Sequence, residues 1–323
     1  MTSTMSPRLL FVAAFIGALS LVAYGASPAQ SRQDGQPIDG TKGRVFKSHS
    51  DLVVLHVNVF DRRFNAVPDL AQEQFAVFED GRQQQITFFK SEDVPVAAGL
   101  VVDNSSSVIA RYGLVVTGAM AFADSSHPED ELFTVHFNEH IRPGLPPQIR
   151  FTSNRALLRA AFAAMKPGGK TALYDAVIDA LDRVEQATHQ KHVIVVLTDG
   201  EDNASVHTKK EMYERAGGSN VIIYTVATDD GRHGASADPD VLRTLAKIGG
   251  GLSYFPRVDA DVVHAFTEIA RNVRSGYSIG YTPSNTSRDG AFRRVRVAVD
   301  VRGRKLTVRC RDGYTAPGPS SAQ

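Results

Sequence analysis

The chain has 323 residues, 42% of them hydrophobic, and a formal net charge of +1. This length favours two domains, or one domain with an insertion, and the composition is that of a globular protein with a sizeable core. The near-neutral charge removes any general reason to expect a nucleic-acid partner. A single cysteine excludes an internal disulfide, so packing must stabilise the fold.

The first 25 residues have the layout of a secretory signal peptide. Arg8 precedes an almost wholly apolar run from Leu9 to Tyr24, which ends in small residues at a plausible cleavage site. The run is short for a membrane span, which needs about 20 residues. We therefore expect an exported protein (periplasm, cell envelope or secreted), with membrane contact only if this segment is retained. Residues 26–43, rich in Ser, Gln, Gly and Pro, are expected to be a flexible lead-in.

Residues 44–94 show the period-two pattern of β-strands. Val53, Leu55, Val57 and Val59 fall on one face of an extended run. Asp80-Gly81 then separates two further extended runs, which is a strong hairpin signal. This segment is therefore predicted to be a β-rich flank.

Residues 95–275 alternate short apolar runs with helical segments. Strands are predicted at 97–102, 132–137, 193–198 and 221–227, with a shorter one near 252–255. Helices are predicted near 108–124, 154–165, 172–188, 208–216, 239–248 and 259–274. Strands that are apolar on both faces and alternate with helices predict the α/β class: a doubly wound, mostly parallel, Rossmann-like sheet with helices on both faces.

Residues 276–316 return to period two. Valines alternate from Val295 to Val301, and a Gly303-Arg304 turn predicts a hairpin that pairs Val301 with Leu306. Its other face would be basic, which indicates either an anionic partner or a solvated, protected edge. The basic residues are Arg294, Arg296, Arg302, Lys305, Arg309 and Arg311.

Each β-rich flank is small for an independent core. We therefore expect 276–316 to pack with 44–94 into one small β-rich domain, with the α/β domain inserted between the flanks. Residues 317–323 are expected to be a loose tail.

Two aspartates follow strongly apolar strands of the predicted sheet. Asp103 ends the run "GLVVD", and Asp199 ends "VVLTD". Ligands of open parallel sheets lie beyond the carboxyl ends of the strands, so both carboxylates would face one crevice if these strands are central. Two like charges there are costly unless a positive charge lies between them, and a divalent cation is the natural candidate.

The hydroxyl groups near these aspartates fit such a cation. Ser105 and Ser107 follow Asp103 at i+2 and i+4, and Thr171 follows a glycine pair in "PGGKTALYDA". Carboxylate and hydroxyl oxygens suit Mg²⁺ or Ca²⁺ better than zinc, which prefers His and Cys. Two carboxylates neutralise the ion, so it remains able to accept one more anion, such as a carboxylate from another molecule.

These residues resemble the metal-ion-dependent adhesion site of von Willebrand factor A domains. Asp103, Ser105, Ser107, Thr171 and Asp199 match the five ligand positions, and the resemblance covers about residues 95–275. The flanking stretches "VFEDGRQQQITFF", "YSIGYTP" and "RDGYTAP" resemble a bacterial, exported subgroup with this domain at its centre. The resemblance implies a non-catalytic module that binds a protein ligand through Mg²⁺, with Mn²⁺ or Ca²⁺ as substitutes. The partner would supply an Asp or Glu side chain.

Other chemistries fit the residues less well. An aspartyl phosphatase normally has a second carboxylate two residues after the first, where this chain has Ser105. No G-x-S-x-G elbow surrounds the serines, and the P-loop pattern fails because residue 164 is Ala. His136 and His140 do not share a helical face, because His136 lies in a predicted strand.

We therefore expect a divalent-cation-dependent protein-binding module without catalytic residues or a small-molecule cofactor. A metal-dependent hydrolase in the same crevice, and an envelope scaffold with a purely structural metal, remain alternatives. Glu201 and Asp202 either shape the field of the site or belong to a surface turn. The polar loop 228–240 either overhangs the site or is simply flexible.

Overall fold

The computed structural model describes residues 52–91, 94–228 and 238–319. The expected signal peptide (1–25), the lead-in (26–43) and most of the 228–240 loop lie outside the described residues. The domain boundaries at 94/95 and 275/276 stay predictions, whereas the secondary structure on either side of them is described below.

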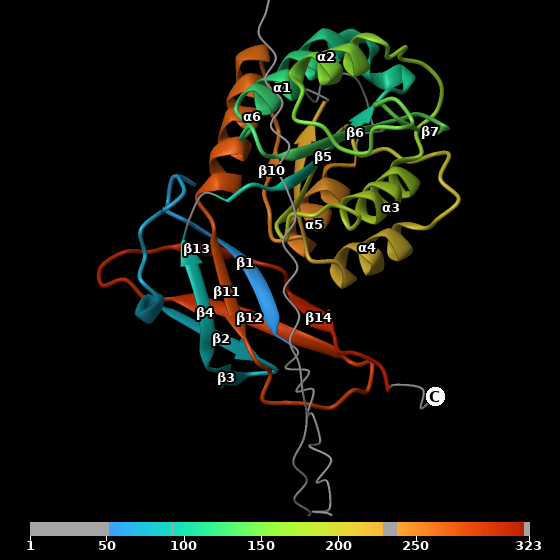
Figure 1. Ribbon diagram of the computed structural model, residues 1–323. Helices are drawn as coiled ribbons and strands as arrows, with labels where there is room; N and C mark the ends of the chain where they lie inside the picture. The colour runs from blue at the N-terminus through green and yellow to red at the C-terminus, as the bar shows by residue number, and fades with distance from the viewer. Residues whose placement is uncertain (1–51, 92–93, 229–237, 320–323) are drawn as a thin grey trace, which may run out of the picture. The chain divides into compact units, whose positions relative to one another are not determined.

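The α/β part contains a six-stranded sheet with the order β10-β9-β8-β5-β6-β7 (Figure 1). All neighbouring strands are parallel except β7, which runs antiparallel to β6. Every residue of β5 and β9 is buried, which explains why these runs are apolar on both faces. The strands are β5 (Ala97–Asp103), β6 (Glu131–Phe137), β7 (Ile141–Pro143), β8 (His192–Thr198), β9 (Val221–Ala227) and β10 (Ser253–Tyr254).

Helices cover both faces of this sheet. Figure 1 shows α1, α2 and α6 on one side and α3, α4 and α5 on the other. Their bounds are α1 (Tyr112–Asp124), α2 (Arg155–Ala163), α3 (Leu173–Val184), α4 (Lys209–Gly218), α5 (Pro239–Ile248) and α6 (Asp259–Arg274). Local caps start several of them, as at α2, where the Asn154 side chain accepts hydrogen bonds from the N–H groups of Ala156 and Leu157. The predicted α/β class is confirmed.

One helical stretch of the described chain, Ser106–Asp124, is long and apolar enough to cross a membrane by length and composition. It consists of the 3₁₀ helix η2 (Ser106–Arg111) and α1. Val115, Ala119 and Phe122 of α1 belong to the buried core of the α/β part, and α1 also packs against α6. Packing within the fold therefore accounts for its apolar composition.

The two flanks together form a pair of four-stranded sheets. Their orders are β13-β1-β11-β4 and β14-β12-β2-β3, so each sheet takes strands from both flanks. Neither flank can complete its sheets alone, and the predicted β-rich unit built from both flanks is confirmed. The elements are β1 (Val53–Phe60), η1 (Gln72–Gln74), β2 (Phe75–Glu79), β3 (Arg82–Gln84), β4 (Ile86–Ser91), β11 (Tyr277–Tyr281), β12 (Phe292–Val299), β13 (Thr307–Arg309) and β14 (Gly313–Thr315).

A buried carboxylate lies inside this β-rich part. Glu79, at the end of β2, is 2% exposed, and its Oε2 accepts hydrogen bonds from the hydroxyls of Tyr281 and Tyr314, each at 2.8 Å. Burial, followed by the hydrogen bond to Glu79, raises the pKa of both tyrosines, so they remain neutral donors. Glu79 thus joins β2 to β11 and β14.

The hairpin predicted at Asp80-Gly81 is confirmed. Glu79 lies opposite Arg82, and both turn residues have positive φ (47° and 83°), as a type I′ turn requires.

The hairpin predicted between residues 295–301 and 306–310 is wrong. The turn at Gly303 exists, with φ of 75°, but it leads from one sheet to the other. β12 pairs with β2 and β14, so that Val297 lies opposite Val77, whereas β13 pairs with β1. Pairing with a strand some 200 residues away buries the valines of β12 better than a local hairpin would, and it also divides the predicted basic face. Arg294 and Arg296 are exposed on β12, while Arg311 is half-buried and donates to the Val54 carbonyl.

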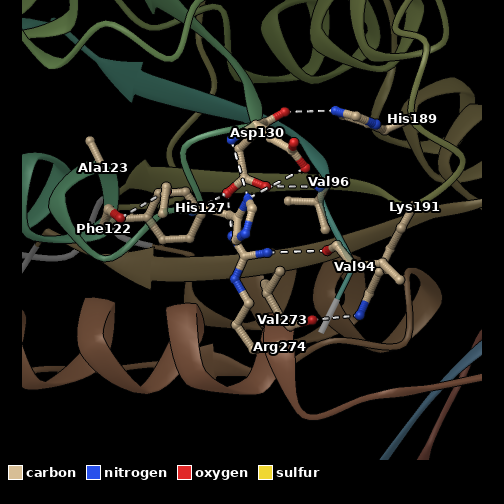
Figure 2. A network of polar contacts seen from close by, with 12 residues as sticks. Val94, Val96, Phe122, Ala123, His127, Asp130, His189, Lys191, Val273 and Arg274 are labelled. Carbon is tan, nitrogen blue, oxygen red and sulfur yellow. Dashed lines mark hydrogen bonds and ion pairs between the residues drawn. The ribbon is translucent and has the colours of Figure 1, made fainter. Parts of the chain in front are cut away.

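Polar contacts fix the place where the chain enters and leaves the α/β part (Figure 2). The Asp130 carboxylate accepts the N–H groups of Val96 and His127, each at 2.8 Å, and pairs with the Arg274 guanidinium at the end of α6. Arg274 also donates to the Val94 carbonyl at 3.1 Å. The segments before β5 and at the end of α6 are therefore clamped to each other.

Candidate metal site

The two aspartates singled out in the sequence follow neighbouring central strands. β5 and β8 are parallel, with Val102 opposite Leu197, so Asp103 and Asp199 emerge at the same edge of the sheet. The chain continues from β5 to β6 on one side and reaches β8 on the other. Such a reversal of strand order opens a crevice at the carboxyl ends of the strands. Both carboxylate residues are buried, with exposed fractions of 1% for Asp103 and 6% for Asp199.

Hydrogen bonds hold the Asp103 carboxylate in place without giving it a countercharge. Its Oδ1 accepts the Ser105 N–H at 2.8 Å, and its Oδ2 accepts the Thr198 hydroxyl at 2.7 Å. The pKa of Asp103 is raised to about 6, chiefly by burial and also by the charge of Asp199, although the hydrogen bonds from Ser105 and Thr198 lower it. The ionised carboxylate is therefore in an electrostatically unfavourable place that a cation would relieve.

The two serine hydroxyls lie next to each other. The Oγ atoms of Ser105 and Ser107 are 3.0 Å apart. Two adjacent ligands of an octahedral Mg²⁺ at about 2.1 Å are themselves about 3.0 Å apart, so this spacing suits one shared ion. Ser105 is buried at 1% exposure whereas Ser107 is exposed, so the pair extends from the interior of the crevice to its mouth.

Thr171 lies on a second loop that is tied to the first. The Gly168 N–H donates to the Asn104 carbonyl at 2.8 Å, and the Ser106 N–H donates to the Gly169 carbonyl at 3.2 Å. Gly169 has φ of 88°, a conformation that favours glycine and allows this close approach. Thr171 itself is 3% exposed.

The third loop, after β8, is tied to the second in turn. The Asn203 side chain accepts the Thr171 N–H at 2.9 Å, and the Thr171 carbonyl accepts the N–H groups of Asn203 and Ala204. Asp199 accepts the Glu201 N–H at 2.9 Å within this loop. All five residues proposed from the sequence therefore lie on three segments that are hydrogen bonded to one another: the end of β5 with the start of η2, the loop before α3, and the loop after β8.

The donor set fits a hard divalent cation. It combines two carboxylates with three hydroxyls, and oxygen ligands are those that Mg²⁺ and Ca²⁺ prefer. Over the described ranges, no group of three or more His, Cys, Asp and Glu side chains is placed to hold a metal ion. His136 is buried in β6, where burial lowers its pKa to about 4, and His140 lies in the following exposed turn.

Several positioning residues were missed or left open in the sequence. Thr198 orients Asp103, and Asn203 holds the Thr171 backbone. Asp202 accepts the Tyr174 N–H and the Ser205 hydroxyl, which gives it a role in the turn. Asp175, at the start of α3, accepts the N–H groups of Val206 and His207. Only Thr198 carried a signal, because it immediately precedes Asp199 at the end of a strand.

A doubly wound sheet with this crevice of carboxylates and hydroxyls defines a class of domain that other chains share. Residues 99–268 match the von Willebrand factor type A domain, and the protein belongs to this family. Domains of the family generally bind protein ligands and are mostly non-catalytic. The comparison with curated protein sequences finds no match.

Solved structures similar to this chain come from several organisms. The von Willebrand factor type A protein of Catenulispora acidiphila is 14% identical, with 84% of this chain and 74% of that chain covered and a TM-score of 0.49. The vWF domain of the type V pili tip protein Mfa5 from Porphyromonas gingivalis is 14% identical, with coverages of 56% and 95% and a TM-score of 0.48. Proximal thread matrix protein 1 from the mussel byssus, with a zinc-occupied MIDAS motif, is 17% identical, with coverages of 60% and 49% and a TM-score of 0.46. Similarity at this level transfers no functional property.

Proposed function

We propose that this protein is an exported, divalent-cation-dependent adhesion module that captures a carboxylate of a partner protein. Asp103, Ser105, Ser107, Thr171 and Asp199 would hold the cation, with Mg²⁺ as the physiological ion and Mn²⁺ or Ca²⁺ as substitutes. The observation that carries the proposal is the buried, uncompensated Asp103 carboxylate beside two serine hydroxyls 3.0 Å apart. Membership of a family of protein-binding domains supports it.

The proposed ligands neutralise the cation but leave it able to bind one further anion. Two carboxylates balance a divalent ion, and the three hydroxyls add no charge, so a bound cation supplies an acceptor for one further anion. Thr198 keeps the Asp103 carboxylate in place, and Asn203 keeps Thr171 in place. No residue of the described crevice is needed as a nucleophile in this role, and we propose that the protein binds without catalysing a reaction.

Calorimetry tests the metal site directly. Titration of the purified protein with MgCl₂ should give one saturable binding event per chain, which Asp103→Ala abolishes. Asp124→Ala is the matched control, because Asp124 is an exposed carboxylate that contacts only Arg155 among the described ion pairs. Equal uptake by wild type and Asp103→Ala, or no uptake by wild type, would contradict the proposed site.

A pull-down from cell-envelope fractions tests the adhesive role. A specific partner should be retained in MgCl₂, lost in EDTA, and lost with Asp103→Ala but not with Asp124→Ala. A partner that is retained equally in all four conditions would exclude capture through the cation. Metal binding together with turnover of phosphate esters would instead favour a hydrolase.

A further inference from the structure

A groove separate from the candidate metal site lies between α4 and the strands β12 and β14. Its volume is about 1030 Å³. Tyr213 and Ile248 line it from the α/β part, and Phe292 and Val295 line it from the β-rich part. Phe292 is 54% exposed and offers an apolar surface to a ligand in the groove. None of the five proposed metal ligands lines this groove.

Two glycines at the end of α4 line the groove without adding side chains to it. Gly217 and Gly218 end α4, and neither has a positive φ. A Cβ added at Gly218 would meet nothing within 4 Å. A glycine in a helix interior costs about 1 kcal/mol relative to alanine, and the cost is smaller at the last residues of a helix such as these. Since neither backbone conformation nor packing requires Gly218, its effect is to leave the groove open.

The groove carries an excess of positive charge. Lys209, Lys210, Arg294 and Arg296 line it against Glu214 and Asp312, and Asp238 pairs with Lys209 from outside the groove, which leaves a net of one positive charge. The lysines are balanced, Lys209 by Asp238 at 3.1 Å and Lys210 by Glu214 at 3.6 Å. Within the described residues, neither arginine has an ion pair.

The two arginines also border a second hollow. This hollow, of about 500 Å³, shares Phe292, Arg294 and Arg296 with the groove, and Phe78 and Asp80 line its other side. The Arg296 guanidinium lies 4.1 Å above the Phe78 ring, which holds it in place by a cation–π contact. The Asp80 carboxylate is already engaged by the Arg294 N–H at 2.9 Å. The hollow therefore extends the groove beyond the Arg296 guanidinium, which the Phe78 ring holds in place.

We propose that this groove binds an extended, acidic segment of a partner protein, independently of the metal site. In an extended segment successive side chains point to opposite faces. Glutamates or aspartates on one face would pair with Arg294 and Arg296 of β12, while apolar residues on the other would contact Tyr213 and Ile248. The unpaired arginines beside an exposed aromatic ring are the feature that selects an acidic segment over a basic or neutral one.

Fluorescence anisotropy with a labelled peptide tests this proposal. The probe is an eight-residue peptide that alternates glutamate with leucine, measured in EDTA so that a metal site cannot contribute. Saturable binding by wild type is expected, and the double variant Arg294→Glu/Arg296→Glu should weaken it about tenfold or more. The control Arg302→Glu/Arg304→Glu makes the same charge change at exposed positions outside the groove and should leave the affinity within about twofold.

A steric variant tests the location without altering charge. Gly218→Phe places a ring where there is open space, so the fold should be retained while probe affinity falls about tenfold. The proposal is overturned if wild type shows no saturable binding, or if a lysine–leucine probe binds equally well. It is also overturned if a single-stranded oligonucleotide displaces the probe as effectively as unlabelled peptide, or if Gly218→Phe binds like wild type. None of these outcomes depends on whether the crevice binds Mg²⁺.

Discussion

The β-rich part and the α/β part each bury a carboxylate, and the groups that surround the two carboxylates differ. Glu79 receives two tyrosine hydroxyls at 2.8 Å, which satisfy it with neutral donors. Asp103 has hydrogen bonds as well, but it lies near a second carboxylate, and its pKa is raised to about 6. Asp130, which precedes β6 and accepts the Val96 N–H, is balanced by the Arg274 cation. A buried acid surrounded by hydrogen-bond donors or paired with a cation serves the fold, whereas one that lies near a second carboxylate indicates a site.

The largest expected effect comes from Glu79→Ala. The change leaves the hydroxyls of buried Tyr281 and half-buried Tyr314 without an acceptor, and loss of two hydrogen bonds to a charged group should lower the free energy of unfolding by about 4 kcal/mol. Urea unfolding with and without MgCl₂ should give the same loss. Glu73→Ala, at an exposed acid in η1, should change stability by less than about 0.5 kcal/mol. A loss for Glu79→Ala that matched this control would contradict the structural role.

Arg274→Met should have the next largest effect. It leaves the Asp130 carboxylate, whose side chain is 1% exposed, without its cation, at a cost of about 3 kcal/mol. Arg271→Met is the matched control on the same helix, because Arg271 is 53% exposed and its pair with Glu268 is worth less than about 1 kcal/mol. Thermal unfolding of both variants measures the difference. Equal melting temperatures would show that the clamp contributes nothing.

Asp103→Asn should stabilise the metal-free protein. The folded pKa of about 6 lies above the ordinary value of 3.8, so the folded state holds the proton more tightly and stability falls as pH rises from about 4 to 6. Asparagine does not titrate, and the variant should gain about 2–3 kcal/mol above pH 6 and nothing below pH 4. Urea unfolding in EDTA across this range measures the gain. With MgCl₂, wild type should recover the difference, and a destabilised variant in EDTA would refute the uncompensated charge.

The smallest effect on stability is expected for Ser107→Ala. Ser107 is exposed, so its loss should change unfolding by less than about 0.5 kcal/mol. Its hydroxyl is nonetheless a proposed ligand, and Mg²⁺ affinity measured by calorimetry should fall about tenfold. Ser106→Ala, at the exposed neighbouring position, should keep wild-type affinity. If the two variants bind Mg²⁺ equally, Ser107 is not a ligand.

The α/β part could be predicted from sequence because its signals are local. Apolar runs such as Val193–Thr198 and the helical patterns between them predicted the sheet and its helices. Asp103 and Asp199 were predicted as site residues because they stand at the ends of strands. The β-rich part could not be predicted in the same detail, because its pairing is long-range. Nothing near Val308 in the sequence indicates that it lies opposite Val59.

The candidate site shows the same limit. The residues proposed as ligands stand in short, ordered patterns, but the groups that orient them do not. Asn203 approaches Thr171 only after α3 and β8 have folded between them. Thr198 points at Asp103 only because β5 and β8 are neighbours. The position of Thr198 directly before Asp199 places it at the strand end, but nothing in the spacing shows which side chain it contacts.

The clamp at Asp130 and Arg274 has a mechanical consequence. Because the segments that lead into β5 and out of α6 are held side by side, the two covalent connections of the α/β part to the flanks lie at one place, and the α/β part is not in series with the flanks. Tension applied between β1 and β14 would first load the ladders of the antiparallel sheets. The crevice would keep its geometry under that tension until the ion pair between Asp130 and Arg274 broke.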